Sequence, residues 1–332
     1  AYVTVIANVL MAGVSGSASA DTAATGSILI PAMKEQGYKP EFAALMVAFS
    51  AMMAPLIPPS IFLIIYGSMS GVSIGRLFMA GIIPGLLVGL SLLILAFILT
   101  RFASFRVETV KFSGQRLKQS SMKAGWALIM PFVIIGGIRF GIFTPTEAGI
   151  VAVVYALFYG FVIERSLNLT NLRELTMSAA LSSANIMMIV GFSAVFGTIL
   201  ALGRFEQQIT SVLFSITEEP LLVVTILIIV LTLIGGLMDE VSTAVLFVPT
   251  LAVIGTQMGF DPVQFGVVMV LAIMMGAVMP PVGTLLFIGV SIAGIPLSRI
   301  LVLVWAFLIP LLLVNLMIAF VPFFTTYLPS FM

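Results

Sequence analysis

Long apolar runs dominate this chain, and short groups of glycine, serine, proline or charged residues separate them. None of the runs shows the alternation of polar and apolar positions that a strand of a membrane barrel requires, so we predict that all are helices. With about 20 apolar residues for each full span, the 332-residue chain supports roughly ten complete or partial crossings of a bilayer. The predicted apolar segments are 1–14, 22–36, 41–66, 78–100, 125–141, 146–164, 174–202, 220–236, 240–256, 263–289 and 300–322.

Four of these segments are too short or too interrupted for a comfortable crossing, and they form two adjacent pairs. A tip rich in glycine, serine or aspartate joins each pair, so we predict two re-entrant helical hairpins, at 1–36 and 220–256. Prolines interrupt the segments that follow, 41–66 and 263–289. Proline removes a backbone donor and frees carbonyl groups, which lipid does not tolerate, so each break is expected to line a protein-filled or wet cavity.

The composition places the chain in a membrane. Hydrophobic residues make up 61% of it and charged residues only 8%, with a mean hydropathy of +1.25, whereas a soluble domain carries about 25% charged residues. The net charge of +1 gives no reason to expect a nucleic-acid partner. The chain contains no cysteine and no histidine, which excludes thiol chemistry, metal sites built on those residues, and Ser–His or Cys–His catalysis.

Basic residues indicate which loops face the cytoplasm. Segment 101–124 carries a run of lysines and arginines interleaved with aromatic residues, and we predict a cytoplasmic amphipathic connector at the inner leaflet. Each hairpin is taken to enter and leave the membrane on one side. The loops 34–40 and 164–174 and residue Arg299 are then inside, and the loop 203–219 and residue Asp261 are outside.

The two hairpins and the segments after them resemble each other in sequence. Aspartate, proline and glycine recur in the same order at nearly constant spacing, which chance matching of apolar residues does not produce. The matched pairs are Asp21 and Asp239, Thr25 and Thr243, Pro31 and Pro249, Pro40 and Pro262, Pro58–Pro59 and Pro280–Pro281, and Gly67 and Gly289. An odd number of predicted crossings separates the hairpins, so the second repeat is inverted relative to the first. Inverted repeats with broken helices are the layout of secondary transporters.

The predicted fold class is therefore an all-α polytopic membrane protein with inverted structural repeats, each holding a re-entrant hairpin and a proline-broken helix. The three scaffold spans before the second hairpin have no counterpart before the first, which predicts about three further helices upstream of Ala1. The predicted parts are a first repeat at 1–100 (hairpin 1–36, broken helix 41–66, helix 78–100), the connector at 101–124, and a second repeat at 125–332 (scaffold helices 125–202, hairpin 220–256, broken helix 263–289, helix 300–322).

The hairpin tips and the proline breaks are the candidate binding sites. Glycine permits irregular backbone, and serine hydroxyls with freed carbonyls offer hard oxygen ligands without net charge, which suits Na⁺. A single motif of this kind is explained by close helix packing or by a simple helix kink. Four motifs in two matched pairs instead favour a binding site. Asp21 and Asp239 can each cap the second arm of their hairpins, a role that is compatible with an ion site.

Two other polar residues are weaker candidates for contact with a substrate or partner. Thr144, Pro145 and Glu147 have the spacing of a capping box, so the bland interpretation of Glu147 is a helix cap. Arg204 lies at the outer end of segment 174–202 and is interpreted either as an interfacial anchor or as a carboxylate contact.

Five motifs occur together: SGSASADTAATGSILIPAM, PLIPPS, FTPTEAG, GGLMDE and PPVGTLLF. Their combination resembles the large membrane subunit of tripartite ATP-independent periplasmic (TRAP) transporters, the DctM-like family, over essentially the whole chain. The resemblance implies Na⁺-coupled uptake of an organic acid, of the C4-dicarboxylate or sialic acid class, across the bacterial inner membrane by an elevator-like motion. It also implies a periplasmic substrate-binding protein and a small four-helix membrane subunit, separate or fused.

By position, the resemblance implies two Na⁺ sites, with substrate between them. The first sodium site would comprise Ser15, Gly16, Ser17, Pro55, Ile57 and Pro58, and the second Gly235, Gly236, Asp239, Met279, Pro280 and Gly283. The candidate substrate contacts are Ser19, Asp21, Ser60, Asp239, Thr243 and Thr284. Helix N-termini that face the substrate would attract its carboxylate, while freed carbonyls hold Na⁺.

Other functions stay open on the sequence. The nearest is a proton-coupled carrier, in which Asp239 or Glu240 would titrate. A channel would need a polar stripe along several helices, whereas this chain concentrates its polarity at the tips. An enzyme is not predicted, because histidine is absent and neither hairpin aspartate follows a Gly-x-Gly sequence.

Overall fold

The computed structural model describes residues 1–102, 114–217 and 219–332, and it divides into two compact units. Unit 1 comprises Ala1–Val110 and Leu200–Met332, and unit 2 comprises Lys111–Ile199. The described residues form helices and connecting turns, without a strand. The prediction of an all-α polytopic membrane protein is therefore confirmed at the level of secondary structure.

The first half of unit 1 is a helix pair, a broken helix and a long helix. Gly16 ends the first helix with a left-handed backbone, Ser17 caps the second, and Ser60 caps the helix that follows the proline break. The elements are α1 (Tyr2–Ser15), α2 (Ala18–Glu35), α3 (Pro40–Ala51), α4 (Ile61–Ser70) and α5 (Ile74–Phe102).

The second half of unit 1 has the same order of elements. Asp239 and Asp261 cap two of its helices, and Gly283 stands before the helix that follows the second proline break. The elements are α10 (Pro220–Gly235), α11 (Glu240–Gln257), α12 (Pro262–Gly276), α13 (Thr284–Ala293) and α14 (Leu301–Phe320), followed by the short α15 (Phe323–Thr326).

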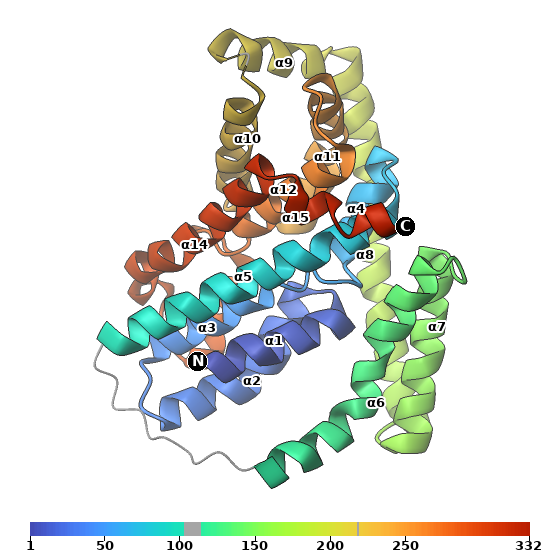
Figure 1. Ribbon diagram of the computed structural model, residues 1–332, viewed down its shortest axis with the longest axis vertical. Coiled ribbons are helices and arrows are strands. Elements are labelled where there is room, and N and C mark those ends of the chain that lie inside the picture. Colours follow the sequence, from blue (N-terminus) through green and yellow to red (C-terminus); the bar gives the residue numbers. More distant parts are fainter. Residues whose placement is uncertain (103–113, 218) are drawn as a thin grey trace. The chain divides into compact units, whose positions relative to one another are not determined.

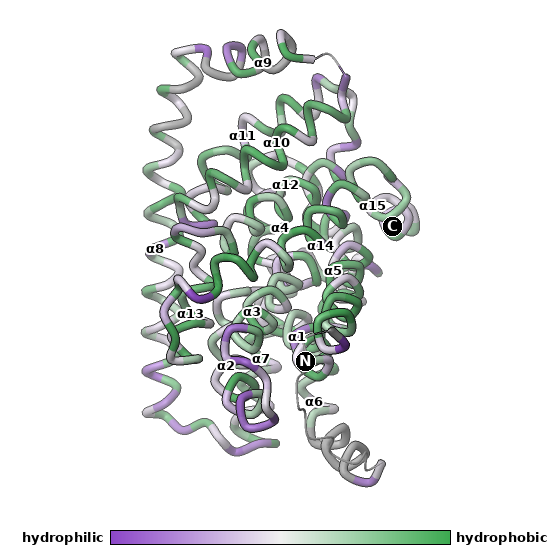
Figure 2. The backbone as a smooth tube through the Cα atoms, turned by 90° about the vertical axis from the view of Figure 1, so that its left-hand side faces the viewer, coloured by the Kyte–Doolittle hydropathy of each residue, from purple (hydrophilic) through white to green (hydrophobic). Residues whose placement is uncertain are grey.

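Helices α3 and α12 form the core of unit 1. Every residue of α12 from Val263 to Gly276 is buried, as is every residue of α3 from Phe42 to Ala51. The halves interlock, because α13 packs on α2 and α3. Helix α4 in turn packs on α11 and α12 (Figure 1). Hydrophobic residues cover most of α10, α12 and α14 (Figure 2). The tip glycines Gly16 and Gly236 are buried in this apolar body, whereas Asp239 at the second tip is exposed.

Unit 2 contains α6 (Gly114–Arg139), α7 (Pro145–Phe158) and most of α8 (Leu169–Leu202). Helix α7 packs on α6 and continues into a π-helical turn at Tyr159–Ile163. Side chains on α7 and α8 are mostly exposed and apolar, as expected for helices that face lipid or another protein.

Five helices are long and apolar enough to cross a membrane within the described residues: Ile74–Arg101, Pro145–Ile163, Leu169–Ser193, Glu240–Gln257 and Leu301–Phe320. The other apolar helices have 10–17 residues. The second arm of the second predicted hairpin, α11, is therefore long enough to span, whereas its first arm, α10, is not. These lengths and compositions are those of a multi-pass membrane protein.

Several boundaries differ from the predictions, and α8, for example, begins at Leu169 rather than residue 174. Helix α2 begins at Ala18 rather than residue 22. The Ser17 side chain caps the helix there, so the small residues of the tip form its first turn. The connector predicted at 101–124 lies partly outside the described residues, and its described end, from Gly114, already belongs to α6. The predicted outer loop 203–219 contains a helix, α9 (Phe205–Ile216), whose apolar residues Ile209, Val212 and Ile216 recur at helical spacing.

Candidate functional site

The first hairpin tip turns sharply between α1 and α2. Gly16 has a φ of 63°, a left-handed conformation that glycine adopts without strain. The Ser17 hydroxyl accepts a hydrogen bond from the Ala20 N–H at 3.4 Å and lies 3.1 Å from the Ser19 hydroxyl. The Ser17 N–H donates to the Ser15 hydroxyl oxygen at 3.2 Å. Three serine hydroxyls therefore gather at this tip, in the turn that precedes Asp21.

The first proline break closes on this tip. The Ile61 N–H donates to the Gly16 carbonyl at 3.4 Å. A Cβ atom on Gly16 would collide with the carbonyl oxygen of Pro59, so no side chain fits between the tip and the break. Ser60 is fully buried and donates to the Pro55 carbonyl at 2.6 Å while its oxygen caps α4. The tip therefore meets the break through residues 59–61.

The second tip and break meet in the same way. The Val282 N–H donates to the Gly236 carbonyl at 3.0 Å. A Cβ atom on Gly236 would lie 2.8 Å from the Cγ atom of Met279, and one on Gly283 would lie 3.0 Å from the Met279 carbonyl oxygen. Three residues predicted for the second sodium site, Gly236, Met279 and Gly283, are thus neighbours. In both halves a tip glycine carbonyl accepts from a peptide N–H of the break.

Asp239 is an exposed helix cap. Its Oδ1 atom accepts hydrogen bonds from the N–H groups of Val241 and Ser242, both at 3.0 Å, and the Thr243 hydroxyl donates to its carbonyl at 2.9 Å. The neighbouring carboxylate makes the contact with the break, because the Thr284 hydroxyl donates to Glu240 Oε2 at 2.9 Å. This hydrogen bond joins α11 to the start of α13.

Asp21 differs from its sequence counterpart Asp239. Ser17, not Asp21, caps α2, so the expectation that Asp21 caps this arm is wrong. Its side chain lies in the first turn of α2 and is fully buried, near the Ser15 hydroxyl. The Ser15 hydroxyl approaches the carboxylate, but no described residue forms a hydrogen bond of good geometry with either of its oxygens.

The predicted site residues fall into two separate groups. In the described part of the chain, no hydrogen bond or ion pair connects residues 15–21 or 55–60 with residues 235–243 or 279–284. The side chain of Ile57 packs against Gly85 of α5, which leaves only its backbone for an ion. The structure therefore does not join the candidate substrate contacts of the two hairpins directly.

Glu147 and Arg204 lie outside both groups. Glu147 forms the predicted capping box, since its Oε2 atom accepts from the Thr144 N–H at 2.8 Å and its own N–H donates to the Thr144 hydroxyl at 3.3 Å. Arg204 is exposed, directly precedes α9 and has a φ of 52°. It forms no ion pair with any other described residue.

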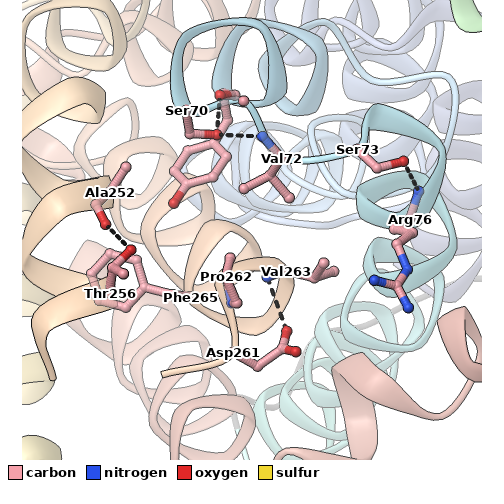
Figure 3. Close-up of a pocket in the computed structure, with 13 residues that line it drawn as sticks. Ser70, Val72, Ser73, Arg76, Ala252, Thr256, Asp261, Pro262, Val263 and Phe265 are labelled. Carbon is pink, nitrogen blue, oxygen red and sulfur yellow. Dashed lines mark hydrogen bonds between the residues drawn. The ribbon is translucent and has the colours of Figure 1, made fainter. Parts of the chain in front are cut away.

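A separate cavity of about 350 Å³ opens between the α4–α5 loop and the α11–α12 loop. Arg76 and Asp261 both line it without forming an ion pair, and Asp261 accepts a hydrogen bond from the Val263 N–H at 2.9 Å (Figure 3). The volume is in the range of small-ligand pockets. None of the residues predicted for the sodium or substrate sites lines this cavity.

Sequence reasoning missed a buried polar network beside the first tip. The Asn8 amide donates to the Ser50 hydroxyl at 2.8 Å, and the Thr25 hydroxyl donates to the Asn8 carbonyl oxygen at 3.2 Å. All three residues are buried. The available signal was a lone asparagine in the otherwise apolar segment 1–14.

No cluster of three or more acidic, histidine or cysteine residues that could hold a metal ion occurs in the described ranges. Carbonyl and hydroxyl oxygens would therefore have to supply most of the ligands of a cation at either tip. Such neutral oxygens suit a weakly charged hard cation better than a transition metal.

Comparison with known proteins gives one consistent result. The family model described as "Tripartite ATP-independent periplasmic transporter, DctM component" matches residues 1–324. The chain is 34% identical to the sialic acid TRAP transporter large permease protein SiaM of Vibrio cholerae, over 99% of this chain and 77% of that protein. It is 31% identical to the C4-dicarboxylate TRAP transporter large permease protein DctM of Pseudomonas aeruginosa, over 100% of this chain and 78% of that protein. It is 32% identical to the isethionate TRAP transporter permease protein DctMQ of Oleidesulfovibrio alaskensis, over 98% of this chain and 52% of that protein.

Proposed function

Because this chain belongs to the DctM family, the large permease component of TRAP transporters, we propose that it carries an organic acid inward by Na⁺ symport. The membrane is the bacterial inner membrane, and the coupling ion is Na⁺. The substrate is an organic acid of the C4-dicarboxylate or sialic acid class, as the names of two relatives suggest. The chain is a permease and has no proposed catalytic role.

The observation that carries the proposal is the matched contact at the two hairpin tips. In each half, a glycine carbonyl at the tip accepts a hydrogen bond from the proline-broken helix, at Gly16 and at Gly236. Irregular backbone inside a membrane is tolerated where it is buried in protein or lines a wet cavity. The freed carbonyls and hydroxyls around each contact are suitable ligands for Na⁺.

We assign the ion ligands from these contacts. In the first site, the backbone of Ser15–Ser17 supplies oxygens together with the carbonyls of the 55–58 break. In the second site, Gly236, Met279 and Gly283 supply backbone oxygens, with Gly235 and Pro280 adjacent. Asp239 and Glu240 then lie at the edge of the second site, where Thr284 already contacts Glu240.

The substrate carboxylate docks where the second arms of both hairpins begin. Helix N-termini carry a partial positive charge, and α2 and α11 both start at the tips. The hydroxyls of Ser19, Ser60, Thr243 and Thr284 would contact it there in exchange for the hydrogen bonds that they form within the protein. Because Na⁺ organises the tips, each ligand strengthens binding of the other by the same factor.

The two repeats and the scaffold have different roles in this mechanism. The hairpins and broken helices of unit 1 form inverted repeats that move together as the transport body of an elevator, and helices 125–202 form the fixed scaffold. A periplasmic binding protein delivers the substrate, and a small membrane subunit, separate or fused, completes the complex.

The test is the thermal stability of the purified full complex in NaCl, against KCl and choline chloride at equal ionic strength. A ligand that binds only the folded state stabilises it by about 2.7 kcal/mol at a hundred times its dissociation constant, so Na⁺ should raise the melting temperature saturably. Uptake into proteoliposomes, with the binding protein present, should follow the Na⁺ gradient.

Two outcomes would contradict this function. Equal melting temperatures in all three salts, with uptake that follows a pH gradient, would establish a proton-coupled carrier, with Asp239 or Glu240 as the titrating group. A steady current that persists without any coupling gradient would establish a channel.

A further inference from the structure

The cavity of about 350 Å³ between the α4–α5 and α11–α12 loops holds two opposite charges that do not pair with each other. Arg76 and Asp261 both line this cavity, and they form no ion pair. Figure 3 shows their charged ends directed toward each other from opposite sides of the space. One loop belongs to the first half of unit 1 and the other to the second half. The cavity therefore presents a cation and an anion from the two halves of one compact unit.

The position of Arg76 is not explained by the stability of its helix. Arg76 lies in the first turn of α5, where the positive end of the helix dipole disfavours a cation. Its backbone N–H donates to the Ser73 hydroxyl oxygen at 3.4 Å, but its guanidinium has no hydrogen-bond or ion-pair partner among the described residues. The guanidinium N–H groups are therefore free for a ligand, and their planar arrangement matches a carboxylate.

Asp261 keeps one carboxylate oxygen for a ligand. Its Oδ1 atom accepts hydrogen bonds from the N–H groups of Val263 and Gln264, both at 2.9 Å, and so caps α12. These two bonds hold the carboxylate in a fixed orientation at the cavity. The Oδ2 atom accepts no hydrogen bond from a described residue. It can therefore accept one from an ammonium or hydroxyl group of a ligand.

The rest of the lining combines a free hydroxyl donor with aromatic rings. Because the Ser73 oxygen accepts from the Arg76 N–H, the Ser73 O–H group can still donate to a ligand. The side chains of Tyr66 and Phe265 line the same cavity and are buried, whereas Arg76 and Asp261 are exposed. A ligand that fits this lining has a charged end between Arg76 and Asp261 and an apolar group against the two rings.

The two charges select the class of ligand. They sum to zero, so a dianion such as a C4-dicarboxylate is attracted by Arg76 but repelled by Asp261. A simple monocarboxylate leaves the Asp261 oxygen without a partner, and a simple amine leaves Arg76 without one. A molecule with both a carboxylate and an ammonium group satisfies both residues through charge-assisted hydrogen bonds.

From these observations we infer that this cavity binds an α-amino acid with an apolar side chain. Its carboxylate contacts Arg76, its ammonium group contacts Asp261, and its side chain packs against Tyr66 and Phe265. The predicted orientation places both loops on the outer side of the membrane, so the ligand enters from the periplasm. None of the residues predicted for the sodium or substrate sites lines this cavity, so the site is separate from the hairpin tips.

The test measures binding of radioactive L-leucine to the purified complete complex, in choline chloride without Na⁺. Binding should be saturable and should raise the melting temperature of wild type. Arg76→Gln and Asp261→Asn should each weaken binding by at least about tenfold, because each removes one charge-assisted hydrogen bond. Both variants should fold, since one removes a cation from a helix start and asparagine caps a helix about as well as aspartate.

The matched control is Arg173→Gln. Arg173 is also an exposed arginine near the start of a helix, α8, and it forms no ion pair with a described residue, but it does not line the cavity. This variant should bind leucine as wild type does.

A series of related molecules tests each contact separately. Isocaproate lacks the ammonium group of leucine, and isoamylamine lacks its carboxylate. Each should bind wild type at least about tenfold more weakly than leucine does. Glycine should also bind more weakly, because it has no side chain to bury against the rings.

Three results would overturn the inference. The first is that L-leucine, L-valine and L-phenylalanine all fail to bind. The second is that leucine binding survives in both Arg76→Gln and Asp261→Asn, because the ligand then lies elsewhere. The third is that isocaproate binds as tightly as leucine, because Asp261 then makes no contact. None of these results bears on the proposed Na⁺ symport, since the assay contains no Na⁺ and measures no uptake.

Discussion

Gly16 shows how much of the first tip depends on one residue. Its φ is 63°, and a Cβ atom there would collide with the Pro59 carbonyl oxygen. Two separate penalties therefore oppose any other residue: the left-handed backbone conformation and the collision with the break. The collision also involves the carbonyl groups that we propose as ligands for Na⁺.

At the residue scale we therefore expect Gly16→Ala to destabilise the complex by more than the backbone penalty alone. The left-handed conformation costs about 1–2 kcal/mol and overpacking typically a further 1–3 kcal/mol. The melting temperature should fall. The rise in melting temperature on adding Na⁺ should also become smaller, because the clash displaces the proline break.

The matched control for this variant is Gly71→Ala. Gly71 also has a left-handed φ, of 74°, but its added Cβ atom would meet nothing within 4 Å. Gly71→Ala should lose stability through the backbone penalty alone. Its melting temperature should rise on adding Na⁺ by as much as that of wild type. Equal losses in the two variants would mean that the close approach to Pro59 is unimportant.

At the scale of elements, a single side-chain bond joins the second hairpin to the helix after the break. The Thr284 hydroxyl on α13 donates to Glu240 Oε2 on α11 at 2.9 Å. Both side chains are half-buried, so the bond is partly shielded from water. This bond fixes how α11 lies against the break that holds Met279 and Gly283.

Thr284→Val and Glu240→Ala should each destabilise the complex by about 1–2 kcal/mol, since a hydrogen bond to a charged group is worth about 1.5–3 kcal/mol before solvent screening. The two losses should not add in the double variant. Melting temperatures of the four proteins form a double-mutant cycle. Strictly additive losses would show that the two side chains do not interact in the complex.

At the scale of the whole molecule, the central expectation is that the two repeats are inverted. Glu35 ends α2 and Gln257 ends α11, and both residues are exposed. These two residues end corresponding helices of the two repeats. An inverted arrangement puts them on opposite sides of the membrane.

The absence of cysteine makes this arrangement directly measurable. In intact cells, a membrane-impermeant maleimide should label Gln257→Cys but should label Glu35→Cys only after permeabilisation. Neither substitution touches a proposed ion site, so uptake should be retained as a check of folding. Labelling of both positions from the same side would contradict the inversion.

The sequence alone determined the apolar segments, their helical character and the breaks between them. These follow from local chemistry: an apolar run must satisfy its backbone within itself in lipid, and glycine, proline and serine end helices wherever they stand. The order of helix pair, broken helix and long helix therefore appears in the structure close to the predicted bounds. The predicted capping box at Glu147 is local in the same sense and is also confirmed. The ion sites stay predictions.

Only the tertiary structure decided which polar side chains are buried and which of them have hydrogen-bond partners. Asp21 and Asp239 are equivalent in the sequence pattern, but burial depends on the helices that pack around each one, and those helices are far apart in the chain. For the same reason, the hydrogen bonds between Glu240 and Thr284 and between Asn8 and Ser50 could not be predicted from the sequence. Periodicity and caps are properties of a segment, whereas the environment of a charge is a property of the packed molecule.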